Sequence, residues 1–189
     1  MKVCVRIMKK SHTHLGIEMW NIALKLGCFV AVVLFTLPGP LQLWAECELR
    51  ADRVVVKKSE RKMYLLNNGQ VIKEYPVSLG LNPVGHKLQK GDKRTPEGVY
   101  VLNHRNSKSN YHKSILFSYP NEQDSRQAKA RGADPGGDLA IHGLPTRDKE
   151  EAWDYIERDW TDGCIAVTND QMEEIWHLVD IGIPIEILP

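Results

Sequence analysis

The sequence predicts a mainly β fold: a single compact, sandwich- or barrel-like domain with a few inserted helices. Short segments rich in β-branched and aromatic residues recur from residue 53 to the end of the chain. Asn68-Gly69 separates the second and third of these segments, which is the strongest short signal for a β-hairpin. Helix-capping patterns occur only in the second half. At 189 residues the chain has room for one such domain behind an N-terminal appendage.

Residues 1–45 have the layout of a secretory signal peptide. Residues 1–25 carry five Lys and Arg against one acidic residue, Glu18, and the apolar run Leu26–Leu37 follows. As a helix these twelve residues would span only about 18 Å, short of a hydrocarbon core of roughly 30 Å. We expect residues 46–189 to form the mature catalytic domain, without a membrane span. Met19 is an alternative start, and an uncleaved anchor in the inner membrane is the alternative to cleavage.

The strand signals follow one another in a simple order. Asn68-Gly69 forms the first turn, and Leu79–Pro96, rich in Gly, Pro and charge, is expected to be a long loop. The predicted strands are Arg53–Lys57, Lys62–Leu66, Gln70–Ser78, Gly98–Asn103, Ser114–Ser118, Leu139–His142, Cys164–Val167 and Ile183–Leu188.

Three polar residues are placed to begin helices. Asn121 precedes the polar segment Glu122–Arg131, which stops at Gly132. Thr146 precedes the amphipathic segment Arg147–Arg158. Thr168 and Gln171 form a capping box that opens a helix over Asn169–Val179.

Charge and motif content exclude several classes of function. Residues 46–189 carry 20 Lys and Arg and 23 Asp and Glu, a net charge of −3. The cations are scattered rather than clustered with aromatic residues, so we expect no nucleic-acid partner. No Cys-x-x-Cys or His-Glu-x-x-His spacing and no glycine-rich phosphate loop is present. No metal or other cofactor is therefore expected.

Cys164 stands in the most unusual local sequence, Trp160–Val167 (WTDGCIAV). Gly163 allows a tight turn that could point the Gly163 and Cys164 N–H groups at one spot, where they would stabilise an oxyanion and favour a thiolate. A nucleophilic cysteine is the hypothesis. A disulfide between Cys164 and Cys47 is the alternative, since an exported protein meets an oxidising compartment.

His142 is the best candidate for a partner base. It ends a hydrophobic strand, precedes Gly143 and lies 22 residues before the cysteine. The two strand ends would have to lie side by side; a structural histidine is the alternative. His86, in the loop Asn82–Lys87, is a second candidate and is expected to contact substrate, with an ordinary exposed loop histidine as the alternative.

Four stretches in order resemble the L,D-transpeptidase catalytic-domain family, cysteine enzymes that act on peptidoglycan stem peptides. They are Tyr75–Gly80 (YPVSLG), Gly91–Gly98 (GDKRTPEG), Ile141–Gly143 (IHG) and Thr161–Cys164 (TDGC). The resemblance runs from about Arg53 to Pro189. It implies that Cys164 is the nucleophile and His142 the general base, whose imidazole is held in its working tautomer by the carbonyl of Gly143.

The cysteine motif departs from the family's usual pattern of Ser-His-Gly-Cys, a hydrophobic residue and Arg. Thr161 and Asp162 stand in place of Ser-His, and Ala166 stands where the Arg would be. Asp162 cannot act as a neutral-pH base as a histidine could, and a lost cation changes how a substrate carboxylate is held. This Thr-Asp-Gly-Cys pattern marks a branch in which some members resemble hydrolases.

The resemblance implies cysteine-dependent acyl transfer in the periplasm. Cys164 would form a thioester with a stem peptide and release D-alanine, and an amine of a second stem or of an envelope lipoprotein would be the acceptor. An amidase or L,D-peptidase that uses water at the same centre is the first alternative. A non-catalytic peptidoglycan-binding module is the second.

Overall fold

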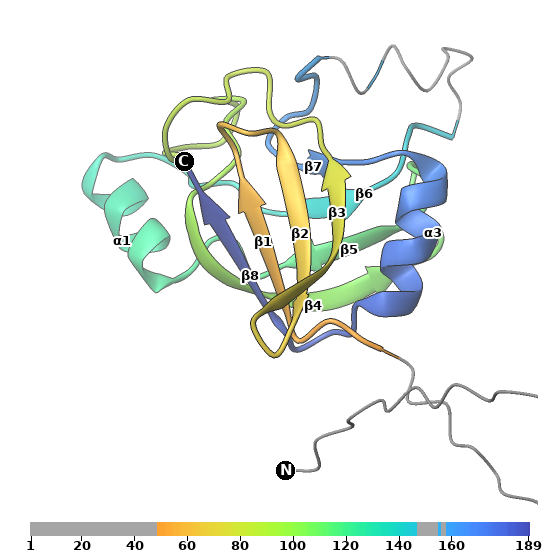
Figure 1. Ribbon diagram of the computed structural model, residues 1–189. Helices are drawn as coiled ribbons and strands as arrows, with labels where there is room; N and C mark the ends of the chain where they lie inside the picture. Colours follow the sequence, from red (N-terminus) through yellow and green to blue (C-terminus); the bar gives the residue numbers. More distant parts are fainter. Residues whose placement is uncertain (1–48, 147–154, 156–157) are drawn as a thin grey trace, which may run out of the picture. The chain divides into compact units, whose positions relative to one another are not determined.

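The computed structural model describes residues 49–146, 155 and 158–189 (Figure 1). The chain divides into two units, Met1–Trp44 and Ala45–Pro189, and every described residue belongs to the second. The expected signal peptide and Cys47 lie outside the described residues, as does most of the expected helix 147–158. No helix in the described ranges is long and apolar enough to cross a membrane.

One mixed sheet of eight strands forms the body of the domain, in the order β3-β2-β1-β8-β4-β5-β6-β7 (Figure 1). The expected mainly β fold with inserted helices is confirmed. The strands are β1 (Arg53–Lys57), β2 (Lys62–Asn67), β3 (Gln70–Pro76), β4 (Gly98–Asn106), β5 (Ser114–Phe117), β6 (Ala140–His142), β7 (Ile165–Ala166) and β8 (Pro184–Leu188).

The first half of the sheet is a meander closed by the C-terminal strand. β1 pairs antiparallel with β2, which pairs antiparallel with β3, and β8 runs parallel to β1. Asn68 and Gly69 both have positive φ, 50° and 77°, as a two-residue turn with this strand twist requires. Alternate residues such as Val54 and Val56 are fully buried, because successive side chains of a strand point to opposite faces.

β4 joins the two halves of the sheet. Residues 98–101 pair with β8, and residues 102–106 pair with β5 after a register shift between Leu102 and His104. An irregularity of this kind bends a strand and increases its twist. β5 then pairs with β6, and β6 with β7, so one long strand carries the sheet around to the short strands.

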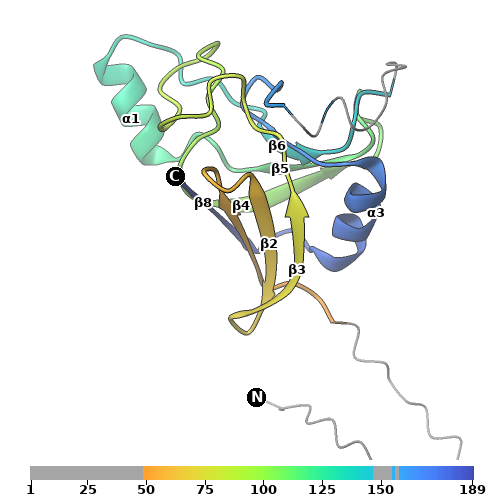
Figure 2. The same ribbon diagram turned by 45° about the horizontal axis from the view of Figure 1, so that its top comes forward.

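Two helices flank the sheet, as Figures 1 and 2 show: α1 (Glu122–Ala130) and α3 (Asn169–Leu178). Each begins with a capping box. The box of Thr168 with Gln171 was expected, whereas Asn121 was expected only as a cap and Asp124 completes its box. Helix α3 packs Met172 and Ile175, both fully buried, into the core. It thereby places its first turn beside the ends of β6 and β7.

The long loop 79–97 packs closely against the rest of the domain. A Cβ built on Gly80 would lie 2.2 Å from the Lys93 carbonyl oxygen, so only glycine allows that approach. Lys58 Nζ is buried and donates to the carbonyls of Gly85 (2.7 Å) and Thr95 (3.0 Å) and to Glu97 Oε1 (2.8 Å). These contacts fix the loop beside the segment that carries Cys164.

Candidate active site

The site forms across two short parallel strands. β6 pairs with β7 so that Ile141 lies opposite Ile165 and His142 opposite Ala166. Cys164 comes one residue before β7, two register positions from His142. Because side chains alternate along strands, His142 and Cys164 project from the same face of this pair. His142 is the last residue of β6 and Cys164 precedes the first residue of β7, so the two candidates lie diagonally across the strand pair rather than at adjacent strand ends.

His142 is buried, with 2% of its surface exposed, and is set up as a neutral base. Its Nδ1 donates to the Gly143 carbonyl at 2.7 Å, which leaves the Nε2 lone pair to accept a proton. Burial lowers the pKa of His142 to about 4, so the imidazole is neutral around pH 7. The predicted tautomer-holding contact is present.

Gly143 is required by crowding at the end of β6. A Cβ built there would lie 2.6 Å from the His112 carbonyl oxygen and 2.7 Å from Asn169 Oδ1. The Asn169 side chain also accepts the Leu144 N–H, at 2.9 Å. The start of α3 is thus packed directly against the turn that orients the imidazole.

Aromatic rings enclose the imidazole. Tyr111 stacks on His142 with 4.0 Å between ring centroids, and Trp160 meets it edge-on at 5.6 Å. Tyr155 packs edge-on against Trp160 in turn, at 5.0 Å. These rings limit rotation of the imidazole and exclude water from it. Sequence reasoning missed Tyr111, which nothing in its local sequence sets apart; Trp160 stood next to the cysteine motif but was given no role.

Cys164 is a free thiol within the described part of the chain. Burial raises its pKa, and a hydrogen bond from the backbone amide of Ala140 opposes that shift. The negative charges of Asp162 and Asp138 raise the pKa further, while Lys87 lowers it. With His142 also neutral, the resting pair is a thiol and an imidazole rather than an ion pair.

The turn before Cys164 is held by Thr161, whose side chain is buried. Its Oγ1 donates to the Cys164 carbonyl at 2.8 Å and accepts from the Gly163 N–H at 3.1 Å. Gly163 has φ of 128°, and a Cβ there would lie 2.5 Å from the Arg94 carbonyl oxygen. The tight turn expected at Gly163 is therefore present, and the Thr161 side chain holds it.

The expected pair of oxyanion donors needs correction. The Gly163 N–H is used inside the turn, because it already donates to Thr161. The Cys164 N–H has no acceptor among the described residues and remains available. Sequence reasoning could not foresee this, because a Thr hydroxyl two residues before a glycine serves a turn or points elsewhere depending on the local backbone.

Asp162 and His86 both make contacts away from Cys164, although Asp162 also lines the cavity beside the thiol. Asp162 is exposed and forms an ion pair with Lys93. Nδ1 of His86 accepts the Glu97 N–H at 3.1 Å, and Nε2 lies 3.1 Å from Asp124 Oδ1 in helix α1. His86 does not line the cavity at Cys164. It connects the long loop to α1.

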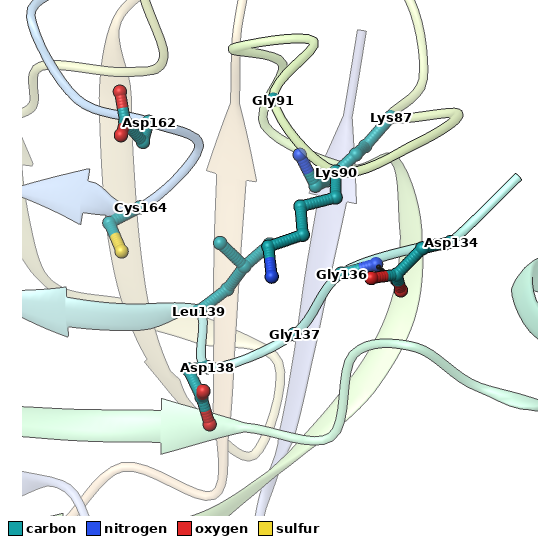
Figure 3. Close-up of a pocket in the computed structure, with 10 residues that line it drawn as sticks. All are labelled: Lys87, Lys90, Gly91, Asp134, Gly136, Gly137, Asp138, Leu139, Asp162 and Cys164. Carbon is teal, nitrogen blue, oxygen red and sulfur yellow. Dashed lines mark hydrogen bonds between the residues drawn. The ribbon is translucent and has the colours of Figure 1, made fainter.

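A cavity of about 530 Å³ opens beside the thiol (Figure 3). Cys164 and Leu139 line it together with charged side chains of both signs, including Lys87 and Asp138. Its walls come from the long loop, the segment before β6 and the cysteine turn. No group of His, Cys, Asp and Glu suited to a metal ion occurs among the described residues. The arrangement offers a candidate nucleophile, a candidate base and a polar binding space.

Fold and site together define a β-rich domain of the Cys–His type, in which a thiol and a neutral imidazole share one face of a strand pair. Sequence comparison identifies the particular family. The chain belongs to the YkuD family, the L,D-transpeptidase catalytic domain, whose profile matches residues 51–187.

A curated relative agrees with this assignment. YafK of Escherichia coli (strain K12), whose name places it among the L,D-transpeptidases, is 30% identical over 112 residues. The match covers 58% of this chain but 38% of YafK, so this chain spans well under half of its relative.

Solved structures share the fold. The helical cell shape determining protein Pgp2 from Campylobacter jejuni superposes with a TM-score of 0.56 at 23% identity, over 74% of this chain and 48% of Pgp2. Bd1075 of Bdellovibrio bacteriovorus gives a TM-score of 0.52 at 27% identity, over 74% of this chain and 48% of Bd1075.

Proposed function

We propose that this domain is a cysteine-dependent acyl-transfer enzyme that acts on peptidoglycan stem peptides, an L,D-transpeptidase. The main observation in support is that His142 lies on the same face of the strand pair as Cys164, beside an open cavity. Its imidazole is neutral, and its Nε2 is free to accept a proton. Membership of the L,D-transpeptidase catalytic-domain family supports the substrate class. We further propose that the chain is exported and works in the periplasm.

In the proposed reaction the Cys164 thiol gives its proton to His142 Nε2 as the sulfur attacks the carbonyl carbon between diaminopimelate and D-alanine. The Cys164 N–H donates to the oxyanion of the tetrahedral intermediate. The Gly143 carbonyl, bonded to Nδ1–H, stabilises the transient imidazolium. His142 returns the proton to the amine as the C–N bond breaks, and D-alanine leaves a thioester on Cys164.

The second step decides between two enzymes that share this centre. An amine of a second stem or of an envelope lipoprotein would attack the thioester in a transferase, and water would do so in an amidase or L,D-peptidase. One observation supports the hydrolase as a second candidate. Charged side chains line the cavity at Cys164, so water has access to the thioester.

Purified protein incubated with tetrapeptide muropeptides, with and without a lipoprotein remnant, tests the proposal. New cross-links between diaminopimelate residues indicate a transferase, and release of tripeptide or remnant without cross-links indicates a hydrolase. No turnover of either substrate would favour the non-catalytic binding module. Full activity of Cys164→Ala would overturn the proposed chemistry.

A further inference from the structure

The cavity beside Cys164 contains two charged side chains that the protein leaves unused. Three others are engaged: Lys87 with Asp92, Asp134 with the Gly136 amide, and Asp162 with Lys93. Lys90 and Asp138 line the same cavity, and neither side chain has a hydrogen bond or ion pair within the described ranges. One positive and one negative group are therefore free to bind a ligand beside the thiol.

Asp138 is held in an unusual backbone conformation. Its φ is 56°, in the left-handed region that residues other than glycine rarely adopt. It lies two residues before β6, which ends at His142, and its charge raises the pKa of the Cys164 thiol. The Asp138 side chain is exposed at the cavity wall, so its carboxylate is accessible to a ligand that enters the cavity.

Lys90 is fixed at its backbone and free at its tip. Its N–H donates to the Asp134 carbonyl at 2.7 Å, and a Cβ built on Gly136 would lie 3.3 Å from Lys90 Cβ. This approach brings the long loop onto the segment that carries Asp138. Figure 3 shows the Lys90 side chain extending from its loop toward Leu139.

β7 carries no cation beside Cys164. The position where the family motif has Arg holds Ala166, which is buried with 2% of its surface exposed, so β7 supplies no positive charge there. Lys87 cannot replace it freely, because its Nζ is 2.8 Å from Asp92 Oδ1. Lys90 is the cavity lysine left to meet a substrate carboxylate.

We propose that Lys90 and Asp138 are specificity-determining residues that bind the carboxylate and the ammonium of a zwitterionic amino-acid end on the acyl donor. This inference rests on the proposed function and adds which donor the site selects. Diaminopimelate has such an end, whereas lysine at the same position has only the ammonium. The site discriminates between them through the carboxylate, since loss of one partner leaves the other charge unpaired.

Two tetrapeptide donors that differ only by diaminopimelate or lysine at the third position test the role of Lys90. Lys90→Gln is expected to lower kcat/KM about tenfold on the diaminopimelate donor and less than about twofold on the lysine donor. Lys129→Gln, which removes an exposed cation from the last turn of α1, is the matched control and should change neither. An equal loss on both donors, or no loss, overturns the role of Lys90.

Asp138→Asn tests the ammonium contact and keeps a side chain that tolerates the left-handed backbone. It is expected to lower kcat/KM about tenfold on both donors with a free ammonium and to have little effect on N-acetylated diaminopimelate. Asp170→Asn, in the first turn of α3, is the matched control. A loss that persists on the acetylated donor overturns the role of Asp138.

A binding experiment distinguishes failure of the proposed function from failure of the zwitterion site. If the wild-type protein turns over neither donor, calorimetry of both peptides with Cys164→Ala still measures recognition. Tighter binding of the diaminopimelate peptide, lost in Cys164→Ala with Lys90→Gln, supports the zwitterion site without the chemistry. Equal affinity for the two peptides, or none for either, overturns the proposal.

Discussion

The two halves of the sheet use polar residues in opposite ways. On the strands β1, β2, β3 and β8, charged side chains face solvent and pair on the surface, as Lys62 does with Glu74 at 2.7 Å; the buried Lys58, just after β1, is an exception. In the half formed by β5, β6 and β7, polar side chains are buried, including Ser114, His142 and the adjacent Thr161. Buried polar groups must be satisfied by specific partners, whereas exposed pairs contribute little.

This difference indicates which parts of the domain are sensitive to substitution. The first half is stabilised by alternating apolar residues, and a change on its outer face alters few contacts. The second half consists of strands of two to four residues, so loops, helix caps and turns must supply the partners. Four substitutions or conditions test this contrast.

The largest effect is expected from the reactive pair. Cys164→Ala and His142→Ala should each lower kcat/KM by about 10³-fold or more, because each removes a group that takes part in forming the thioester. Stem-peptide turnover followed by chromatography measures this. His177→Ala, on the exposed side of α3, is the control and should retain activity. Partial activity of His142→Ala with normal folding would argue for another base.

The next effect concerns the turn before the cysteine. Gly163→Ala would place a side chain at a backbone φ of 128°, and its Cβ would lie 2.5 Å from the Arg94 carbonyl oxygen. We expect the free energy of unfolding in urea to fall by about 3–4 kcal/mol. Gly69→Ala in the β2–β3 hairpin also has a positive φ but no atom within 4 Å of its Cβ, and should cost only about 1–2 kcal/mol. Equal losses would contradict the contrast between the halves.

The pH dependence should report the buried histidine. The folded-state pKa of His142 is about 4, below the ordinary histidine value of 6.5, so the unfolded chain binds its proton first as the pH falls. The contribution of His142 to the free energy of unfolding is fully present above about pH 6.5. It falls by on the order of 3 kcal/mol as the pH drops toward 4.

Urea unfolding at several pH values measures this loss, and His142→Asn should remove that part of the pH dependence. Activity should keep its acid limb near pH 4 rather than near 6.5, because the imidazole must be neutral to accept the thiol proton. An acid limb near 6.5 would show that the histidine is more solvated than its burial implies.

The smallest effect is expected at an exposed position of the site. The Asp162 charge raises the pKa of Cys164, so Asp162→Asn should lower that pKa and speed alkylation by iodoacetamide at pH 7 about two- to threefold. Glu74→Gln removes an exposed carboxylate from the other half and should leave the rate unchanged. Slower alkylation of Asp162→Asn would contradict this prediction. It would mean that Asp162 acts mainly by holding the cysteine turn through its ion pair with Lys93, and not through the effect of its charge on the pKa of Cys164.

Much of the fold was predictable because its signals are local. All eight predicted strands agree with the structure to within about three residues at each end, and the Asn68-Gly69 turn, the Asn121 cap and the Thr168–Gln171 capping box are present. The strand predicted over Cys164–Val167 is shorter in the structure, where only Ile165 and Ala166 pair. Alternation and capping depend on neighbours in sequence, which is why these elements could be read directly.

The candidate site was predictable only in its chemistry. Cys164 and His142 could be proposed from residue type and position, and the role of the Gly143 carbonyl from the family resemblance. The partners of His86, the engagement of the Gly163 N–H by Thr161, and the stacking of Tyr111 on His142 could not. The Thr161 contact depends on the backbone conformation of its own turn, whereas the other two depend on segments that only the tertiary structure brings together.

The sequence by itself therefore determined the order of the elements, the reactive residue types and the glycines beside them. Only the tertiary structure decided which N–H groups are free, which histidine lies beside the thiol and which cavity charges remain unpaired. The physical reason is that propensities and caps act within a few residues, whereas burial and hydrogen-bond satisfaction depend on contacts across the whole chain.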